Sequence, residues 1–148
     1  MKYRLLFVST AAVAGLAMFA AVALAGSSSA TSPIIAVVGS GSGLMAVAMN
    51  SSDHGTFVGE ITASIQDATP DAVFRVQRAL DDTPTGRCDS LGAYELQGTL
   101  AVNDVGAGAA HLEKRSQAPS GTTFDVLFQF VGDDGSLLES NCLTLTVK

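Results

Sequence analysis

The chain has 148 residues, of which 47% are hydrophobic and 15% charged, and its formal net charge is −6. This length suits one domain of ordinary size and leaves little room for a second. The composition excludes collagen, coiled coils and disulfide-dense small domains, because each of these classes needs a far stronger bias in residue usage. Apolar residues recur along the whole chain, which argues against extended disorder.

The N-terminus has the three parts of an export signal. Lys2 and Arg4 precede a long apolar stretch, and Ala23-Leu24-Ala25 supplies the small-x-small pattern that signal peptidase accepts. We predict a helical signal peptide over residues 1–25, cleaved after Ala25, and therefore a secreted or cell-surface protein. The alternative is an uncleaved helix over Leu5–Ala25 that anchors the chain in a membrane.

The balance of charges limits the classes of partner. Cleavage would remove two of the eight basic residues, Lys2 and Arg4, so the formal net charge would fall from −6 to −8. An acidic surface repels phosphate backbones and anionic lipid headgroups. The sequence therefore predicts no nucleic-acid partner and no membrane partner for the mature form. An unidentified protein or a glycan is the expected partner class.

The chain contains two cysteines, Cys88 and Cys142, which lie 54 positions apart. Two cysteines in an exported chain usually pair, and closing a loop of this size stabilises the fold by roughly 4 kcal/mol. We predict a structural disulfide. In its predicted strand Cys142 points to the side opposite Leu143 and Leu145, which are expected to face the core. Cys88 lies in a polar loop. The bridge is therefore expected near an edge or an outer face. The core-crossing disulfide of antibody domains differs in this respect.

From residue 43 onward the sequence alternates with period two, and turn residues interrupt it about every dozen positions. Residues 26–42 are expected to be a flexible polar spacer rich in glycine and serine, and residues 43–148 a single domain. Seven strands are predicted, at 44–49, 57–65, 72–79, 93–102, 109–114, 123–131 and 138–147. Seven short strands at this spacing predict an all-β fold, an antiparallel β-sandwich of immunoglobulin-like architecture.

The alternation also predicts which side chains point inward. The strongest signal is in strand 123–131, where every second residue is large and apolar, namely Phe124, Val126, Phe128 and Phe130. A single flat sheet would leave these phenylalanines in water, which favours two stacked sheets. In strand 93–102 the same pattern places four residues inward, namely Tyr94, Leu96, Leu100 and Val102.

A glycine-rich segment, Ile34–Gly43, imitates the strand and turn of a dinucleotide-binding fold. The third glycine of that motif would fall at position 44, which is Leu44, and no helix follows. We interpret the segment as the entry to the first strand and predict no cofactor.

Metal ligands are scarce. His54 lies in a polar turn, and His111 and Glu113 share the outer face of strand 109–114. Together these three side chains would meet the ligand count of a catalytic zinc site if the fold brought them together. A metal-binding protein or metalloenzyme is therefore kept as an alternative, although solvated surface histidines explain the same residues and no metal site is predicted.

No catalytic constellation is found, and no Gly-x-Ser-x-Gly elbow precedes a helix. We therefore predict a binding or structural module without catalytic residues. Loops carry function on such scaffolds, and the predicted binding loop contains Asp81, Asp82, Arg87 and Asp89. A second alternative is an inhibitor that presents the Thr83–Leu91 loop to a secreted hydrolase. Asn50-Ser51-Ser52 also meets the glycosylation sequon.

Overall fold

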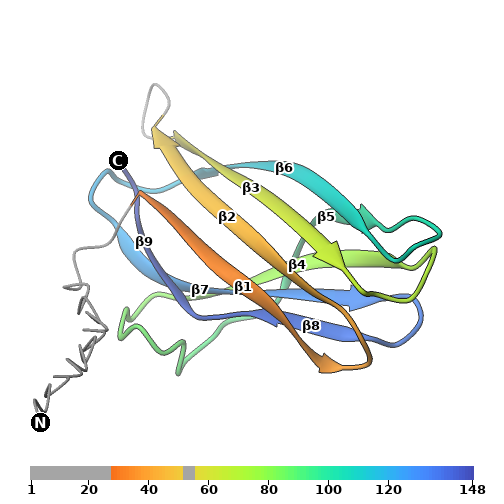
Figure 1. Cartoon of the computed structure of the whole chain (residues 1–148). Coiled ribbons are helices and arrows are strands. Elements are labelled where there is room, and N and C mark those ends of the chain that lie inside the picture. The colour runs from red at the N-terminus through yellow and green to blue at the C-terminus, as the bar shows by residue number, and fades with distance from the viewer. Residues whose placement is uncertain (1–27, 52–55) are drawn as a thin grey trace, which may run out of the picture.

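The computed structural model describes residues 28–51 and 56–148 (Figure 1). In this part of the chain nine strands form one antiparallel sheet, and no helix is present. The strands are β1 (Ser29–Val38), β2 (Ser42–Ser51), β3 (Thr56–Gln66), β4 (Val73–Asp81), β5 (Glu95–Ala101), β6 (Gly108–Gln117), β7 (Thr123–Gly132), β8 (Leu137–Ser140) and β9 (Leu143–Thr146). The predicted signal peptide lies outside the described residues and stays a prediction.

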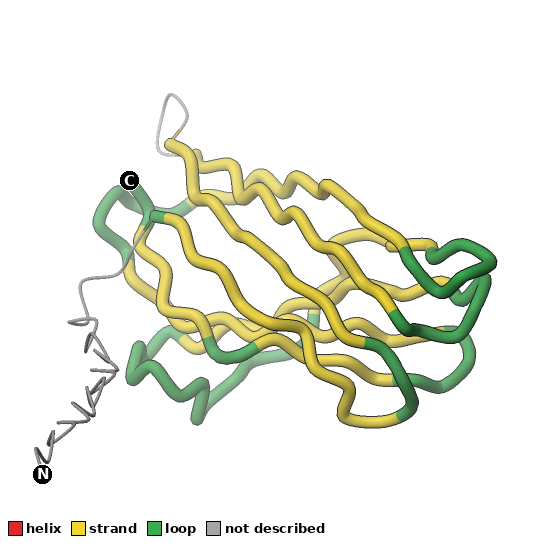
Figure 2. Tube along the Cα trace, in the orientation of Figure 1, coloured by secondary structure: helices red, strands yellow, loops and turns green. Residues whose placement is uncertain are grey.

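The sheet folds over on itself into two layers. Its strand order is β5-β4-β7-β8-β1-β2-β3-β6, and β9 also pairs with β7. One layer holds β1, β2, β3 and β6, and the other holds β4, β5, β7 and β9, with β8 joining them (Figure 1). The connecting loops gather at the two ends of the strands (Figure 2). The predicted antiparallel β-sandwich is confirmed.

The prediction of a flexible spacer over residues 26–42 is wrong for Ser29–Val38. These residues form β1, which pairs with β2 along one edge and with β8 along the other. Residues 39–41 of the glycine-rich segment form the turn of the β1–β2 hairpin, where Gly39 and Gly41 have φ values of 81° and 126°. Side chains rarely adopt these angles, so the glycines serve the hairpin. The hydrogen bonds of β1 to two strands outweigh the weak strand preference of its serines.

The last predicted strand is divided into β8 and β9. Both pair with β7, but the register moves by one residue between them. The backbone N–H of Phe128 donates to Ser140 Oγ at 3.0 Å, and Asn141 N–H donates to Ser32 Oγ at 2.8 Å. Side-chain hydroxyls therefore satisfy backbone groups that the irregularity takes out of the ladder. After the irregularity, from Leu143 onward, the predicted inward side chains Leu143, Leu145 and Val147 are buried.

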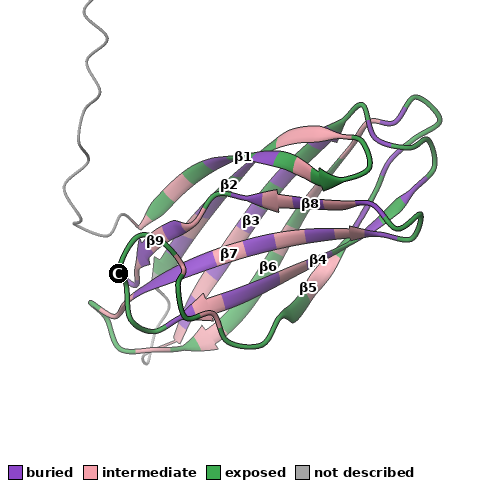
Figure 3. Cartoon of the chain, turned by 90° about the horizontal axis from the view of Figure 1, so that it is seen from below, coloured by how far each residue is buried: buried purple, intermediate pink, exposed green. Residues whose placement is uncertain are grey.

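The core lies between the two layers, and along β1, β2 and β3 its residues alternate with more exposed ones (Figure 3). Phe124, Val126, Phe128 and Phe130 are all buried, as the alternation of β7 predicts. Other predicted inward residues that are buried include Met45, Val47, Met49, Phe57, Ile61, Ala63, Ile65, Phe74 and Val76.

Around strand β5 the alternation of buried and exposed side chains differs from the predicted one. Leu100 and Val102 are buried, but Tyr94 and Leu96 are 37% and 54% exposed. The cause is a bulge: Val76 pairs with Gly98, whereas the next residue, Gln77, pairs with Leu96. One extra residue on β5 reverses the faces beyond it. The β5 and β6 edges approach each other beside this bulge, where Gly98 faces Leu112 so closely that an added Cβ would lie 2.6 Å from Leu112 Cδ2.

Two substitutions in β5, one on each side of the bulge, test the reversal of its faces. Leu100→Ala removes a buried side chain and is expected to lower the free energy of unfolding by about 2–5 kcal/mol. Leu96→Ala removes an exposed one and is expected to change it by less than about 1 kcal/mol. Urea denaturation with the disulfide intact measures both. Equal losses in the two variants would contradict the reversed faces of β5.

Candidate functional site

The loop over residues 82–94 connects β4 to β5 and lies over the outer face of β4, β7 and β9. Three outward-pointing positions beneath it are buried: Ala79 and Asp125 are 0% exposed, and Asp81 is 2% exposed. Asp81 and Asp125 are direct partners in the β4–β7 ladder, and Asp125 is also paired with Thr144 of β9. The loop thus covers two carboxylates that the strands alone would leave in water.

Asp125 holds the first half of the loop. Its Oδ2 accepts the backbone N–H groups of Thr85 at 2.8 Å and Gly86 at 2.7 Å, and its Oδ1 accepts the Thr144 hydroxyl at 2.6 Å. Burial by itself raises the pKa of the Asp125 carboxyl, but the hydrogen bonds from Thr144 and from backbone N–H groups outweigh burial and lower it. The carboxylate therefore stays ionised at neutral pH.

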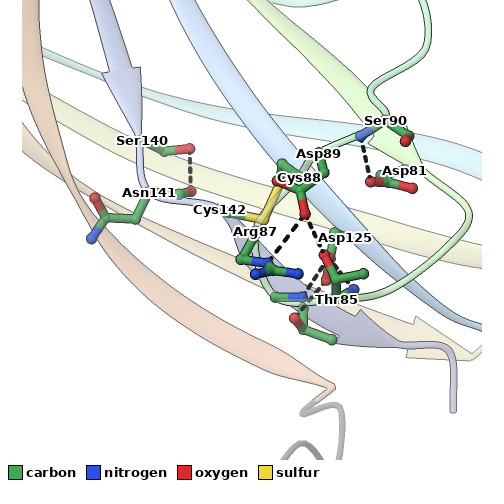
Figure 4. The surroundings of a disulfide bond; sticks show 12 residues. Asp81, Thr85, Arg87, Cys88, Asp89, Ser90, Asp125, Ser140, Asn141 and Cys142 are labelled. Atoms are coloured by element: carbon green, nitrogen blue, oxygen red, sulfur yellow. Dashed lines mark hydrogen bonds and ion pairs between the residues drawn. A yellow bond between two sulfur atoms is a disulfide. The ribbon is translucent and has the colours of Figure 1, made fainter.

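Asp81 and the disulfide hold the loop on either side of the segment that Asp125 binds. Asp81 Oδ1 accepts the Thr83 N–H at 2.9 Å, and its Oδ2 accepts the Ser90 N–H at 2.8 Å. Cys88 is bonded to Cys142, with their Cα atoms 5.7 Å apart. The predicted disulfide is confirmed, as is its position on an outer face (Figure 4). The backbone of the loop is fixed at several points along its length.

The structure changes the predicted set of binding residues at one position. Asp81 is buried and fully engaged by the loop backbone, so its assignment to the binding surface is wrong. Asp82, Arg87 and Asp89 are exposed on the solvent side of the loop. Arg87 Nε lies 3.1 Å from Asp89 Oδ2, and both side chains stay more than half exposed. The site presents these three charged groups together with Thr83, Pro84 and Thr85 on a fixed backbone.

The metal candidates do not come together in the described residues. His111 Nε2 lies 3.9 Å from Glu113 Oε1, and Thr62 Oγ1 is 3.0 Å from His111 Nδ1. No group of three histidine, cysteine or acidic side chains able to hold a metal occurs within residues 28–51 and 56–148. His54 lies outside the described residues. The metal hypothesis therefore has only two neighbouring ligands on an exposed strand.

Sequence reasoning missed Asp125 and Thr144. Both lie at outward positions of strands that were predicted correctly, and outward polar residues are ordinarily solvated. The available signal was the position of Cys142 on the same outward face as Thr144. A disulfide on that face requires the Cys88 loop to lie over it, and a carboxylate beneath a loop needs backbone donors.

Comparisons with family models, with curated proteins and with solved structures find no match to this chain. Within the described residues, no helix has the length and apolar character needed to cross a membrane.

The pKa of Asp125 leads to a prediction about acid stability. A carboxyl whose pKa is lower in the folded than in the unfolded state stabilises the fold above its unfolded value, about 3.9, and this contribution is lost as the pH falls through the folded value. Asp125→Asn should lower the free energy of unfolding by about 2–4 kcal/mol at pH 7. It should also flatten the decrease in stability below about pH 4.

Urea denaturation between pH 2 and pH 7 measures both effects, and Asp82→Asn, an exposed carboxylate of the same loop, is the matched control. Equal acid sensitivity of wild type and the Asp125 variant would contradict the assigned role.

Proposed function

We propose that the protein is an exported, non-catalytic binding module, secreted or held at the cell surface, which recognises a protein partner through the loop over residues 82–94. The observation that supports this proposal is a loop whose backbone is fixed by two buried carboxylates and a disulfide while its side chains face solvent. A fixed loop loses little conformational entropy when it binds.

The direction of the loop's backbone groups favours recognition by side chains. The N–H groups of Thr83, Thr85, Gly86 and Ser90 point inward to the two carboxylates. They are therefore unavailable to pair with a partner strand, which is how an extended peptide joins a sheet edge. Gly86 and Cys88 also have φ values of 75° and 53°, which bend the loop. These features disfavour an inhibitor that lies in an enzyme cleft like an extended substrate.

Export is tested by the N-terminus of the protein recovered from its native host. Cleavage after Ala25 predicts a chain that begins at Gly26, recovered from the extracellular or cell-surface fraction. Intact-mass analysis measures this directly. A full-length chain retained in the membrane fraction would instead support an uncleaved anchor over Leu5–Ala25 and would contradict release of the module.

Binding is tested with a triple variant of the exposed charges, Asp82→Ala, Arg87→Ala and Asp89→Ala. Its matched control is Arg75→Ala, Asp104→Ala and Glu113→Ala, which changes the net charge by the same amount at exposed positions elsewhere. In cross-linking capture from the native extracellular fraction, we expect one partner to be captured by the wild type and the control and lost from the loop variant. Equal capture by all three proteins would contradict the assignment to this loop.

A further inference from the structure

Strand β4 places a charged side chain between the two layers. Its inward residues Phe74 and Val76 belong to the core, and Arg78, two positions further along, is also buried, at 8% exposed. The Nε atom of Arg78 is shielded from solvent and has no hydrogen-bond partner among the described residues. A buried N–H group without a partner is rare in folded proteins and requires an explanation.

Glu95 on the neighbouring strand β5 balances the charge of Arg78 only in part. Its Oε2 atom lies 3.8 Å from Arg78 Nη2, which is too long for a good hydrogen bond, and the Glu95 side chain is 66% exposed. Burial lowers the pKa of the Arg78 guanidinium, and the attraction of Glu95 offsets this only in part. Within the described part of the chain, the guanidinium therefore lacks a close counterion.

Arg78 lines a small cavity between the layers. The cavity has a volume of about 10 Å³, which is room for about one particle of the size of a water molecule. Its walls are largely apolar and include Met49, Phe124 and Phe128, and Lys114 of β6 is the second charged residue that lines it. Two cationic residues, one from each layer, therefore line one small internal space.

Gly59 of β3 helps to leave this space open. It is buried at an inward position between Phe57 and Ile61, and it pairs with Lys114 in the β3–β6 ladder. A Cβ atom added to Gly59 would lie 3.6 Å from Met49 Sδ and 3.7 Å from the Lys114 carbonyl oxygen, which are ordinary contacts. A methyl group would therefore fit at Gly59 and take up part of the cavity that this residue lines.

We propose that this cavity binds a single small monovalent anion, of about the size of chloride, between Arg78 and Lys114. The two cations and the Glu95 carboxylate leave one positive charge, which one monovalent anion neutralises. A water molecule accepts a hydrogen bond from Arg78 Nε but leaves the buried charge unbalanced, and such a charge is costly without a counterion. Lys114 is exposed on the edge strand β6, so its side chain can move aside to admit the ion.

The test measures chloride binding by the protein recovered from the exported fraction, with its disulfide intact. A single-atom ligand is limited to weak binding, with a dissociation constant on the order of 0.1 M. Because the ion binds only the folded state, about 0.5 M sodium chloride should raise the folding equilibrium constant about sixfold. Sodium gluconate at the same concentration is the reference salt, because its anion is far too large for the cavity. Urea denaturation measures the difference, and broadening of the chloride NMR signal measures binding directly.

Four variants locate the ion. Arg78→Met removes the buried charge and should abolish the chloride effect, and an apolar replacement of similar size usually preserves the fold. Arg75→Met is the matched control, because Arg75 is exposed on the outer face of the same strand; it should keep the full effect. Gly59→Ala narrows the cavity without changing any charge and should weaken binding about tenfold or more. Glu95→Gln removes a competing negative charge and should tighten binding severalfold.

A wild type whose stability and chloride signal show no chloride dependence beyond that of the Arg78 variant would overturn the proposal, because a water molecule would then suffice to fill the cavity. Equal losses in the Arg75 and Arg78 variants would also overturn it, since binding would then depend on overall charge. If Arg78→Met fails to fold, Gly59→Ala decides the question, and unchanged chloride binding in that variant would place the ion outside this cavity.

Discussion

Strand β7 is paired along both edges, buried along its inward face and buried on its outward face at Asp125, and the rest of the structure depends on this constraint. Its inward face supplies Phe124, Val126, Phe128 and Phe130 to the core between the layers. Its outward face carries Asp125, which is covered by the loop over residues 82–94. Strand β4 pairs with one edge, and β8 and β9 share the other. The core and the candidate site are therefore two sides of a single strand.

Within this one loop, the groups that stabilise the fold are separate from the side chains that we propose bind a partner. The groups directed inward, which are Asp81, Asp125 and the disulfide, satisfy backbone donors and keep the loop against the sheet. The side chains directed outward contribute little to that framework, because the Arg87–Asp89 ion pair is exposed and such pairs contribute little to stability. The outward residues can therefore vary without loss of the fold, as the binding loops on other rigid scaffolds do.

Much of the fold follows from alternation alone, and the exceptions have local physical causes. The sequence predicts the inward faces of β2, β3, β4 and β7 because period two has no competing signal there. It does not predict β1, because Ile34–Val38 is a continuous apolar run between serine- and glycine-rich segments and lacks alternation. The alternation predicts the wrong face for Leu96, because the faces of β5 reverse at a bulge. This bulge arises in the pairing of β5 with β4, and the local sequence pattern does not reveal that pairing.

The candidate site is only partly predictable from sequence for a similar reason. The cysteine pair and the exposed loop charges follow from composition and spacing, whereas Asp125 lies 40 residues from the N–H of Thr85 that it binds. Native-state amide hydrogen exchange tests this anchoring most directly. We expect the amides of Thr85, Gly86 and Ser90 to exchange slowly although they belong to an exposed loop, because they donate to buried carboxylates. Exchange of these amides at the rate of an open, solvated loop would contradict it.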